Sequence, residues 1–237
     1  MQFKTPLLRG RLVKRYKRFL ADVVLDDGRE ITATCPNTGS MMGLAEPGLP
    51  IWLSQSASPT RKYAHTWELV ELGTGTSRTF VGINTSHPNG IVSEAIAEGF
   101  VQPLAGYASL RREVKYGQSS RIDILLEDPI KGCAYVEIKN VHLLRQPGLA
   151  EFPDSRTERG VKHLAELTDM RRAGHRAVMV YLIQRGDALR FQTARDIDPK
   201  YADALASARA AGVEAYAIRC RITPEAIAVD SLLDGVG

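Results

Sequence analysis

Two short stretches decide how the second half of this chain folds: Arg121-Ile122-Asp123-Ile124-Leu125-Leu126 and Tyr135-Val136-Glu137-Ile138-Lys139-Asn140. Side chains alternate between the two faces of a strand, so Glu137 and Lys139 share one face while the apolar residues beside them share the other. Asp123 interrupts the first stretch in the same way. If the two strands are hairpin partners, Asp123 and Glu137 can lie side by side, with Lys139 one pleat away.

The sequence around these stretches predicts a mixed α/β domain over residues 79–237. Apolar residues at helical spacing from Ile91 to Phe100 predict a helix that ends near Gly99. A three-stranded meander follows, and helices then alternate with strands. The expected elements are strands 110–116, 121–126 and 133–138, a helix 156–172, strands 177–183 and 189–193, a helix 201–211 and a strand 213–221.

Residues 1–78 indicate a separate small β-barrel, which makes the chain a two-domain protein of the α+β or α/β class. The segment 10–25 is strand-like throughout and leads through an Asp27-Gly28 turn into a second strand, so the two are expected to form a hairpin. Further strands are expected at 50–54 and 65–72. The polar, glycine-rich segment Gly73-Thr74-Gly75-Thr76-Ser77 is where we place the domain boundary.

Composition excludes several classes of protein. Hydrophobic residues make up 44% and charged residues 24% of the 237, as in ordinary globular proteins. Three distant cysteines support neither a disulfide framework nor a cysteine metal site, and reduced thiols suit a cytoplasmic location. The longest strongly apolar run, 177–183, is too short to span a membrane, and no signal peptide is visible. Glycine-rich nucleotide-binding loops are also missing, so no membrane partner or nucleotide cofactor is expected.

Basic residues gather at the start of the chain. The formal net charge is +4 and the isoelectric point is about 9.0. Seven basic residues and no acidic one stand in the first 18 positions: Lys4, Arg9, Arg11, Lys14, Arg15, Lys17 and Arg18. This distribution favours a polyanion as partner.

Asp123 and Glu137 predict a metal centre. Two neighbouring carboxylates repel each other, and a hard cation such as Mg²⁺ or Mn²⁺ removes that cost. A third carboxylate from the preceding helix would complete the ligand set, with Glu94 the first choice and Glu98 a competitor one turn later. Glu113 is a weaker candidate because it lies on a strand beside Val114.

A plainer interpretation of the same residues stays open. Asp123 could pair with Arg121 or Arg112 at the end of a strand. Glu137 and Lys139 would then be an exposed ion pair on one face of the sheet. In that case, the charged residues would be structural and no metal would bind.

Two groups of residues are candidates for nucleic-acid contact. Lys14, Arg15, Tyr16, Lys17 and Arg18 mix cations with an aromatic ring, which suits a groove that follows phosphates and stacks bases. The alternative is a charged edge strand, with Tyr16 in the barrel core. Arg159, Lys162 and His163 share one helix face and could reach phosphates, although a solvent-facing stripe has the same spacing.

The sequence resembles the sugar fermentation stimulation protein family over nearly its whole length. The shared motifs are Cys35-Pro36-Asn37-Thr38-Gly39-Ser40-Met41, Arg61-Lys62-Tyr63, Thr66-Trp67-Glu68-Leu69, Val92-Ser93-Glu94-Ala95, Ser120-Arg121-Ile122-Asp123, Val136-Glu137-Ile138-Lys139-Asn140, Phe152-Pro153-Asp154-Ser155 and Arg159-Gly160-Val161-Lys162-His163-Leu164. Val161 departs from the pattern, since related chains often carry a polar residue there.

This resemblance implies an OB-fold barrel joined to a nuclease-like domain of the PD-(D/E)xK restriction-endonuclease type. It implies a DNA-binding protein linked to the regulation of sugar use. Asp123 would be the metal-binding aspartate, Glu137 and Lys139 the E-x-K pair, and Glu94 the helical glutamate. The catalytic set expected on these grounds is Glu94, Asp123, Glu137 and Lys139.

The sequence thus predicts a cytoplasmic, Mg²⁺- or Mn²⁺-dependent endo- or exonuclease that binds DNA in preference to RNA. One alternative is a non-catalytic, DNA-binding transcriptional regulator of sugar metabolism that keeps the nuclease scaffold. Another is an RNA-binding or scaffolding module that uses the barrel alone. The oligomeric state is left open, a homo-oligomer included.

Overall fold

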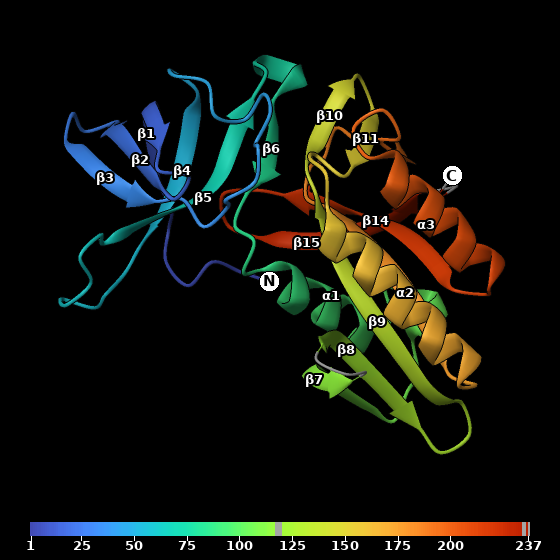
Figure 1. Cartoon of the computed structure of the whole chain (residues 1–237). Helices are drawn as coiled ribbons and strands as arrows, with labels where there is room; N and C mark the ends of the chain where they lie inside the picture. The colour runs from blue at the N-terminus through green and yellow to red at the C-terminus, as the bar shows by residue number, and fades with distance from the viewer. Residues whose placement is uncertain (117–119, 234–235, 237) are drawn as a thin grey trace.

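The computed structural model describes residues 1–116, 120–233 and 236, and its first six strands form one sheet (Figure 1). The sheet order is β3-β2-β1-β4-β5-β6, and a parallel pairing of β3 with β5 closes five of the strands into a barrel. Trp67 and Leu12 are among the side chains that fill its core. The strands are β1 (Leu8–Tyr16), β2 (Leu20–Leu25), β3 (Glu30–Thr34), β4 (Pro50–Gln55), β5 (His65–Leu72) and β6 (Thr79–Gly82).

The sequence predicts one strand over residues 10–25, but in the structure this segment forms most of a hairpin. Lys17 and Arg18 have φ angles of 49° and 65°, so the chain turns there and β2 runs back along β1. Residues other than glycine seldom adopt this left-handed conformation, and their sequence gives no sign of it. The expected barrel is confirmed, but its first arm is divided.

A second six-stranded sheet carries the rest of the chain, in the order β15-β14-β12-β9-β8-β7. Its antiparallel meander β7-β8-β9 confirms the expected one, while β12 runs parallel to both β9 and β14. The strands are β7 (Ser109–Tyr116), β8 (Ser120–Asp128), β9 (Gly132–Val141), β12 (Arg176–Ile183), β14 (Glu214–Ile222) and β15 (Ile227–Leu233).

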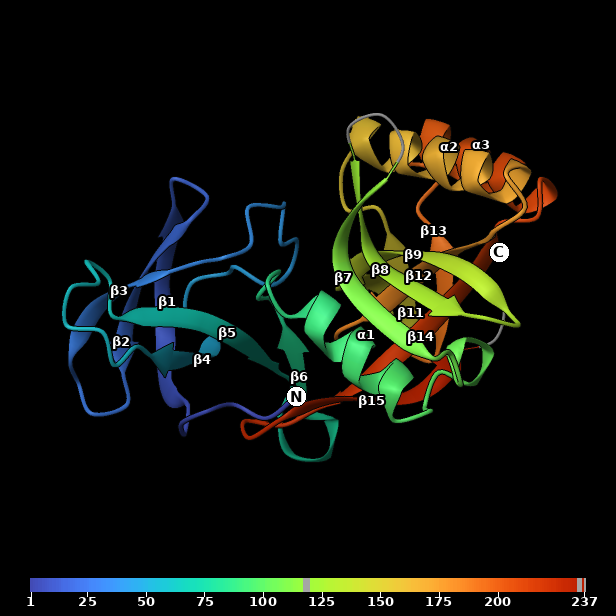
Figure 2. The same cartoon turned by 90° about the horizontal axis from the view of Figure 1, so that it is seen from below.

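Helices cover both faces of this sheet (Figure 2). Helix α1 (Pro88–Ala97) packs on one face, and α2 (Glu158–Arg172) and α3 (Pro199–Ala210) pack on the other. Because strand residues alternate, β12 sends Val178, Val180 and Leu182 towards α1, and its remaining apolar residues towards α2 and α3. Within the described residues, no helix is long and apolar enough to cross a membrane.

A small third sheet and the strand β6 tie the two units together. Strands β10 (Leu143–Gln146), β11 (Leu149–Phe152) and β13 (Arg190–Thr193) form the small sheet beyond the end of β9. The barrel sheet continues through β6 to residue 82, past the boundary expected at 78. Gly82 N–H then donates to the carbonyl of Gln184, at 2.9 Å. The barrel and the mixed sheet are therefore joined by backbone contacts.

Candidate active site

Strands β8 and β9 bring Asp123 beside Glu137, as the alternation predicts. Their pairing runs from Asp128 opposite Gly132 to Ile124 opposite Val136. One residue further along, the Asp123 carboxylate replaces the backbone as acceptor, and its Oδ2 takes the Ile138 N–H at 2.7 Å. The two strands thus separate where the acidic residues stand.

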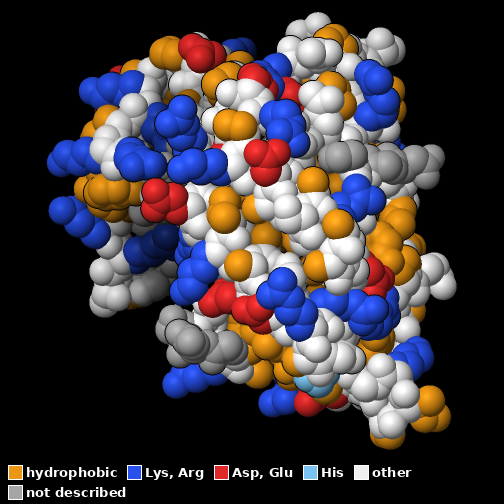
Figure 3. Space-filling model, turned by 45° about the vertical axis from the view of Figure 1, so that its right-hand side comes forward, with side chains coloured by type: hydrophobic (Ala, Val, Ile, Leu, Met, Phe, Trp, Pro, Cys, Tyr) orange, Lys and Arg blue, Asp and Glu red, His pale blue; other side chains and the backbone are white. Residues whose placement is uncertain are grey.

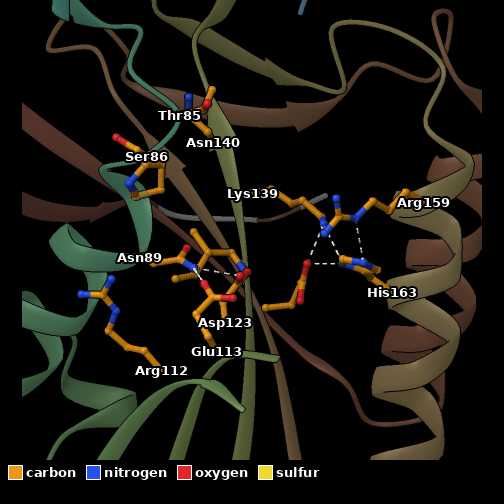
Figure 4. A pocket seen from close by; sticks show the side chains of 13 residues that line it. Thr85, Ser86, Asn89, Arg112, Glu113, Asp123, Lys139, Asn140, Arg159 and His163 are labelled. Atoms are coloured by element: carbon orange, nitrogen blue, oxygen red, sulfur yellow. Dashed lines mark hydrogen bonds and ion pairs between the residues drawn. The ribbon is translucent and has the colours of Figure 1, made fainter. Parts of the chain in front are cut away.

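Asn89, in the first turn of α1, holds Asp123 from the other side (Figure 4). Its side-chain amide donates to Asp123 Oδ1 at 3.0 Å and to Glu113 Oε1 at 2.5 Å. Glu113 lies on β7 between residues paired with Ile122 and Ile124, so it stands across from Asp123. Its φ angle of 55° is rare outside glycine and marks a local irregularity in the strand.

Glu137 is the most deeply buried carboxylate of the group, with 2% of the residue exposed. Its Oε1 atom accepts a hydrogen bond from Lys139 Nζ at 2.9 Å and a short one from His163 Nδ1. Its Oε2 atom is buried and has no hydrogen-bond partner among the described residues. A buried carboxylate oxygen without a partner is costly unless a ligand completes it.

Arg159 fixes the histidine that contacts Glu137. Its Nε–H donates to His163 Nε2 at 3.2 Å, so Nε2 acts as acceptor and the ring proton lies on Nδ1, towards Glu137. His163 is 6% exposed and both ring nitrogens are engaged. His163 therefore supports Glu137, and Arg159 is the other member of the predicted phosphate-binding trio that lines the cavity described below.

Lys162 lies one residue before His163 but points to a different partner. Its ammonium group is 3.6 Å from the carboxylate of Glu166, one helical turn further on, and its side chain is 54% exposed. Glu166 also accepts a hydrogen bond from Ser120, at the start of β8. Lys162 is thus outside the cavity described below, beside β8.

The environment moves the pKa values of the two carboxylates in opposite directions. Burial raises the pKa of Asp123, the nearby charge of Glu137 raises it further, and the Ile138 N–H and Asn89 oppose this only in part. Burial also raises the pKa of Glu137, but the hydrogen bond from His163 and the charge of Lys139 outweigh it, so the pKa falls below the usual range. A negative charge is therefore best accommodated on Glu137.

Asp123, Glu137 and Lys139 line an open, polar cavity of about 420 Å³. Residues near the N-terminal ends of α1 and α2 complete its lining. Arg112 enters from β7 and Asn140 from the far end of β9. Thr85 and Ser86, from the segment that joins the barrel to α1, close the side nearest the barrel. The cavity presents cations and carboxylates together, which suits a charged ligand.

Glu94, expected as the third carboxylate, lies elsewhere. It contacts the N-terminal amine of Met1 at 2.5 Å and, with Glu98, lines a different cavity beside β15. The α1 face towards the sheet is apolar, and the residue it offers to Asp123 is Asn89. Glu113, the weaker candidate, occupies the place expected for Glu94. Its position opposite Asp123 across the β7–β8 hairpin was the signal available in the sequence.

The basic arm of the barrel is largely committed to holding a loop. Arg15 Nη2 donates to the carbonyls of Arg18, Asn37 and Gly39 at 2.9–3.0 Å, and Arg18 Nε donates to Thr38 O at 2.9 Å. That loop reaches the α/β unit through a hydrogen bond of 3.0 Å from Ser40 to Asp154. The motif from Cys35 to Met41 is thus a contact between the domains.

The other members of the arm face outward. Lys14 lies 3.5 Å from Asp22, which also accepts a hydrogen bond from the Tyr16 hydroxyl at 3.0 Å. Lys17 is exposed at the turn. Lys and Arg side chains gather towards the left of Figure 3, the side on which the barrel lies. Lys14 and Lys17 are exposed and are not among the residues that hold the loop.

Carboxylate oxygens are the groups here that could hold a metal ion. In the part of the chain that the structure describes, no three His, Cys, Asp or Glu side chains are grouped to hold a metal by themselves. Asp123 and Glu137 nevertheless both line the cavity, and Oε2 of Glu137 has no hydrogen-bond partner among the described residues. Oxygen donors of this kind suit hard cations.

Comparisons with known proteins agree with this architecture. The family model described as "SfsA N-terminal OB domain" matches residues 13–83, and "Sugar fermentation stimulation protein RE domain" matches residues 86–226. Sugar fermentation stimulation protein homologs of Rhodospirillum centenum and Brucella anthropi are each 58% identical over 233 residues, which is 98% of this chain and 98% and 99% of theirs.

A solved structure, described as "The structure of Pyrococcus Furiosus SfsA in complex with Ca2+", superposes with a TM-score of 0.87 at 28% identity. The superposition covers 100% of this chain and 98% of that one. The OB barrel and the mixed α/β domain implied by the sequence are thereby confirmed. This chain belongs to the sugar fermentation stimulation protein family.

Proposed function

We propose that this chain is a Mg²⁺- or Mn²⁺-dependent nuclease that hydrolyses phosphodiester bonds, with DNA as the preferred substrate. The buried, unpartnered Oε2 of Glu137 carries the proposal, because Glu137 lines an open polar cavity together with Asp123 and Lys139. A ligand that binds at this oxygen would offset the cost of burying it without a partner.

The donor set fits Mg²⁺ better than a cation that needs a complete protein cage. Mg²⁺ is usually bound by one or two carboxylates, with waters and substrate phosphates in the remaining positions. Asp123 and Glu137 supply two carboxylates, and the open cavity leaves room for the rest. The related Pyrococcus furiosus protein was solved in complex with Ca²⁺, another hard cation, which supports a site of this chemical class.

Hydrolysis of a phosphodiester would be shared between a bound metal ion and basic side chains of the protein. When bound, the metal would polarise a phosphoryl oxygen and lower the pKa of a coordinated water. Lys139 places an ammonium group 2.9 Å from Glu137, where it can neutralise charge that develops on the phosphate. Arg159 and Arg112 flank the cavity and can position neighbouring phosphates.

Cleavage of labelled oligonucleotides tests the proposal. Single-stranded and duplex DNA and RNA are incubated with the full chain in Mg²⁺, in Mn²⁺ or in a chelator. We expect cleavage that needs metal and that Asp123→Asn and Lys139→Ala abolish. Glu98→Gln is the matched control, since Glu98 lies outside the cavity. Cleavage that survives Asp123→Asn would contradict the proposed site.

The second candidate is a DNA-binding regulator that keeps the nuclease scaffold without turnover. The exposed Lys14 and Lys17 on the barrel favour binding, and neither needs the cavity. In the same assay, tight binding without cleavage under any metal condition would favour this candidate.

A further inference from the structure

One buried carboxylate of the barrel has no part in the proposed chemistry. Glu68, on β5, belongs to the motif Thr66-Trp67-Glu68-Leu69 and is 5% exposed. Its Oε1 accepts a hydrogen bond from Ser54 at 2.6 Å, within the barrel. Its Oε2 accepts from Asn84 and His87, both at 2.8 Å, and these two residues lie outside the barrel.

Asn84 and His87 frame the short segment that enters helix α1. The side chain of Asn84 accepts hydrogen bonds from the backbone N–H and the hydroxyl of Ser86, at 3.0 and 2.7 Å. The carbonyl of His87 accepts the N–H of Ile91 at 3.0 Å, in the first turn of the helix. Glu68 thus binds both ends of the segment that connects the two domains.

Asn89 is only two residues beyond His87. It stands in the first turn of α1 and donates to Asp123 Oδ1 at 3.0 Å. The position of this amide depends on where α1 begins, because Pro88 restricts the backbone at the first helical position. Hydrogen bonds thus link Glu68 to His87 and Asn89 to Asp123, and the backbone through Pro88 connects His87 to Asn89.

We propose that Glu68 is a positioning residue: from inside the barrel it fixes the start of α1, and so sets Asn89 against the Asp123 carboxylate. The inference rests on the proposed function for its consequence in metal binding, though not for the contacts themselves. The barrel then has a second task besides binding nucleic acid, which is to hold the metal-binding aspartate in place.

The environment of Glu68 supports a role for its acceptor oxygens. Burial raises the pKa of its carboxyl group, but the hydrogen bonds from His87, Ser54 and Asn84 outweigh burial and lower the pKa below its usual value. The ionised side chain is thus stabilised by donors that belong mainly to the entry of α1. Removal of the acceptor would leave Asn84 and His87 unsatisfied.

Glu71 offers a matched control on the same strand. It is 7% exposed and buried much like Glu68, but its partners are Arg9 and Trp52, which belong to the barrel. Glu68→Met and Glu71→Met both remove a buried carboxylate with little change in volume. Glu68→Gln is the conservative variant, because an amide can donate to Ser54 and still accept from Asn84 and His87.

Hydrogen exchange and Mn²⁺ binding test the inference on the full chain. In Glu68→Met, we expect faster exchange in residues 84–92 and an Mn²⁺ affinity lower by about tenfold or more, the size seen when support for a metal ligand is lost. Affinity is measured as the rise in melting temperature with Mn²⁺ concentration. We expect Glu68→Gln to restore the wild-type behaviour, and Glu71→Met to leave both readouts unchanged.

Two outcomes would overturn the inference: unchanged exchange over residues 84–92 in Glu68→Met, or the same increase in Glu71→Met. If Glu68→Met does not fold, His87→Leu removes the same contact from the surface side, and His87→Gln keeps a donor. Failure of the wild-type chain to bind Mn²⁺ or to cleave would contradict the proposed function instead. The exchange pattern decides the role of Glu68 in either case.

Discussion

Glu68 in the barrel and Glu137 in the mixed sheet are buried to a similar extent, with 5% and 2% of the residue exposed, but their surroundings differ. Both oxygens of Glu68 accept hydrogen bonds, from three donors in all. Glu137 has one oxygen shared by Lys139 and His163 and one without a partner among the described residues. The two glutamates thus differ in hydrogen bonding rather than in burial, and it is the unpaired oxygen on which the proposed role of Glu137 rests.

The largest expected effect is the difference between Glu137→Gln and Glu68→Gln. Glu137→Gln should lower the rate of DNA cleavage by on the order of 10² to 10³-fold, the size of effect seen when one electrostatic contact to a transition state is lost. Glu68→Gln should cleave at close to the wild-type rate, because its amide can keep the hydrogen bonds. Single-turnover cleavage at saturating Mg²⁺ measures both. Equal losses in the two variants would remove the distinction.

Stability should separate the two carboxylates less than cleavage does. Glu68→Met leaves the donors of Asn84 and His87 without an acceptor and should lower the free energy of unfolding by about 1–3 kcal/mol. Glu137→Met should cost a similar amount, because it leaves Lys139 and His163 without their acceptor, although it also removes the charge that raises the pKa of Asp123. Urea unfolding in a chelator compares the two. An unchanged free energy of unfolding in Glu68→Met would contradict the structural role of its hydrogen bonds.

A third comparison tests which glutamate joins Asp123 at the proposed metal site. Glu113 shares the Asn89 amide with Asp123, whereas Glu94 contacts the N-terminal amine of Met1. Glu113→Gln should weaken Mn²⁺ binding by about tenfold, in line with the loss of a group that supports a metal ligand. Glu94→Gln should bind as the wild type does. Titration calorimetry tests this, and the opposite result would restore the assignment made from the sequence.

The pH dependence of stability should have opposite signs in the two domains. The pKa of Glu68 is below its usual value of 4.5 in the folded state. Its charge therefore stabilises the fold above that value, and the benefit is lost as the pH falls through the folded pKa. The pKa of Asp123 is above its usual value of 3.8. Its stabilising contribution is present at lower pH and is lost as the pH rises through the folded pKa.

Variants with a neutral side chain show in which direction each carboxyl group changes the stability with pH. Relative to Glu68→Gln, the wild type should lose stability as the pH falls below 4.5, the usual pKa of that group. Relative to Asp123→Asn, the wild type should lose stability as the pH rises above 3.8. Urea unfolding of metal-free protein across this range gives both curves. Curves with the same slope would contradict the assigned surroundings of one carboxylate.

Strand alternation predicted the faces of β9, and the pairing of β9 with β8 predicted that Asp123 and Glu137 are neighbours. It was wrong for β8, where Ile122 and Ile124 were expected on one face but pack in the cores on opposite faces of the sheet. Glu113 could not be placed with the same certainty, because its positive φ and its contact with Asn89 arise only when β7 packs near α1. The turn at Lys17 was missed for a related reason. The barrel imposes its left-handed backbone conformation, and a lysine at this position does not indicate it.

Segments that pair only through tertiary contacts were also missed. Strand β6 lies beyond the expected boundary because it extends the barrel sheet while its last residue bonds to Gln184 of the other unit. Strands β10, β11 and β15 were not predicted either. Of these, β10 and β11 are only four residues long, and strands so short offer little periodicity to detect.

The smallest expected effect separates two arginines that the sequence predicted as nucleic-acid contacts, one in the barrel arm and one on a helix face. Arg15, in the barrel, donates to three backbone carbonyls, while Arg159, on α2, is exposed beside the cavity. Arg159→Ala should reduce the slope of log affinity against log salt by about 1, as expected for one lost phosphate contact. Arg15→Ala should leave that slope unchanged and lower stability instead, because the loop from Asn37 to Gly39 loses its donor.

Fluorescence anisotropy with a labelled DNA, at several salt concentrations and with a chelator present, measures the slopes without cleavage. A reduced slope in Arg15→Ala would mean that the barrel arm binds phosphate through the same side chain that holds the loop, so that structural and binding roles in the barrel would no longer be separate.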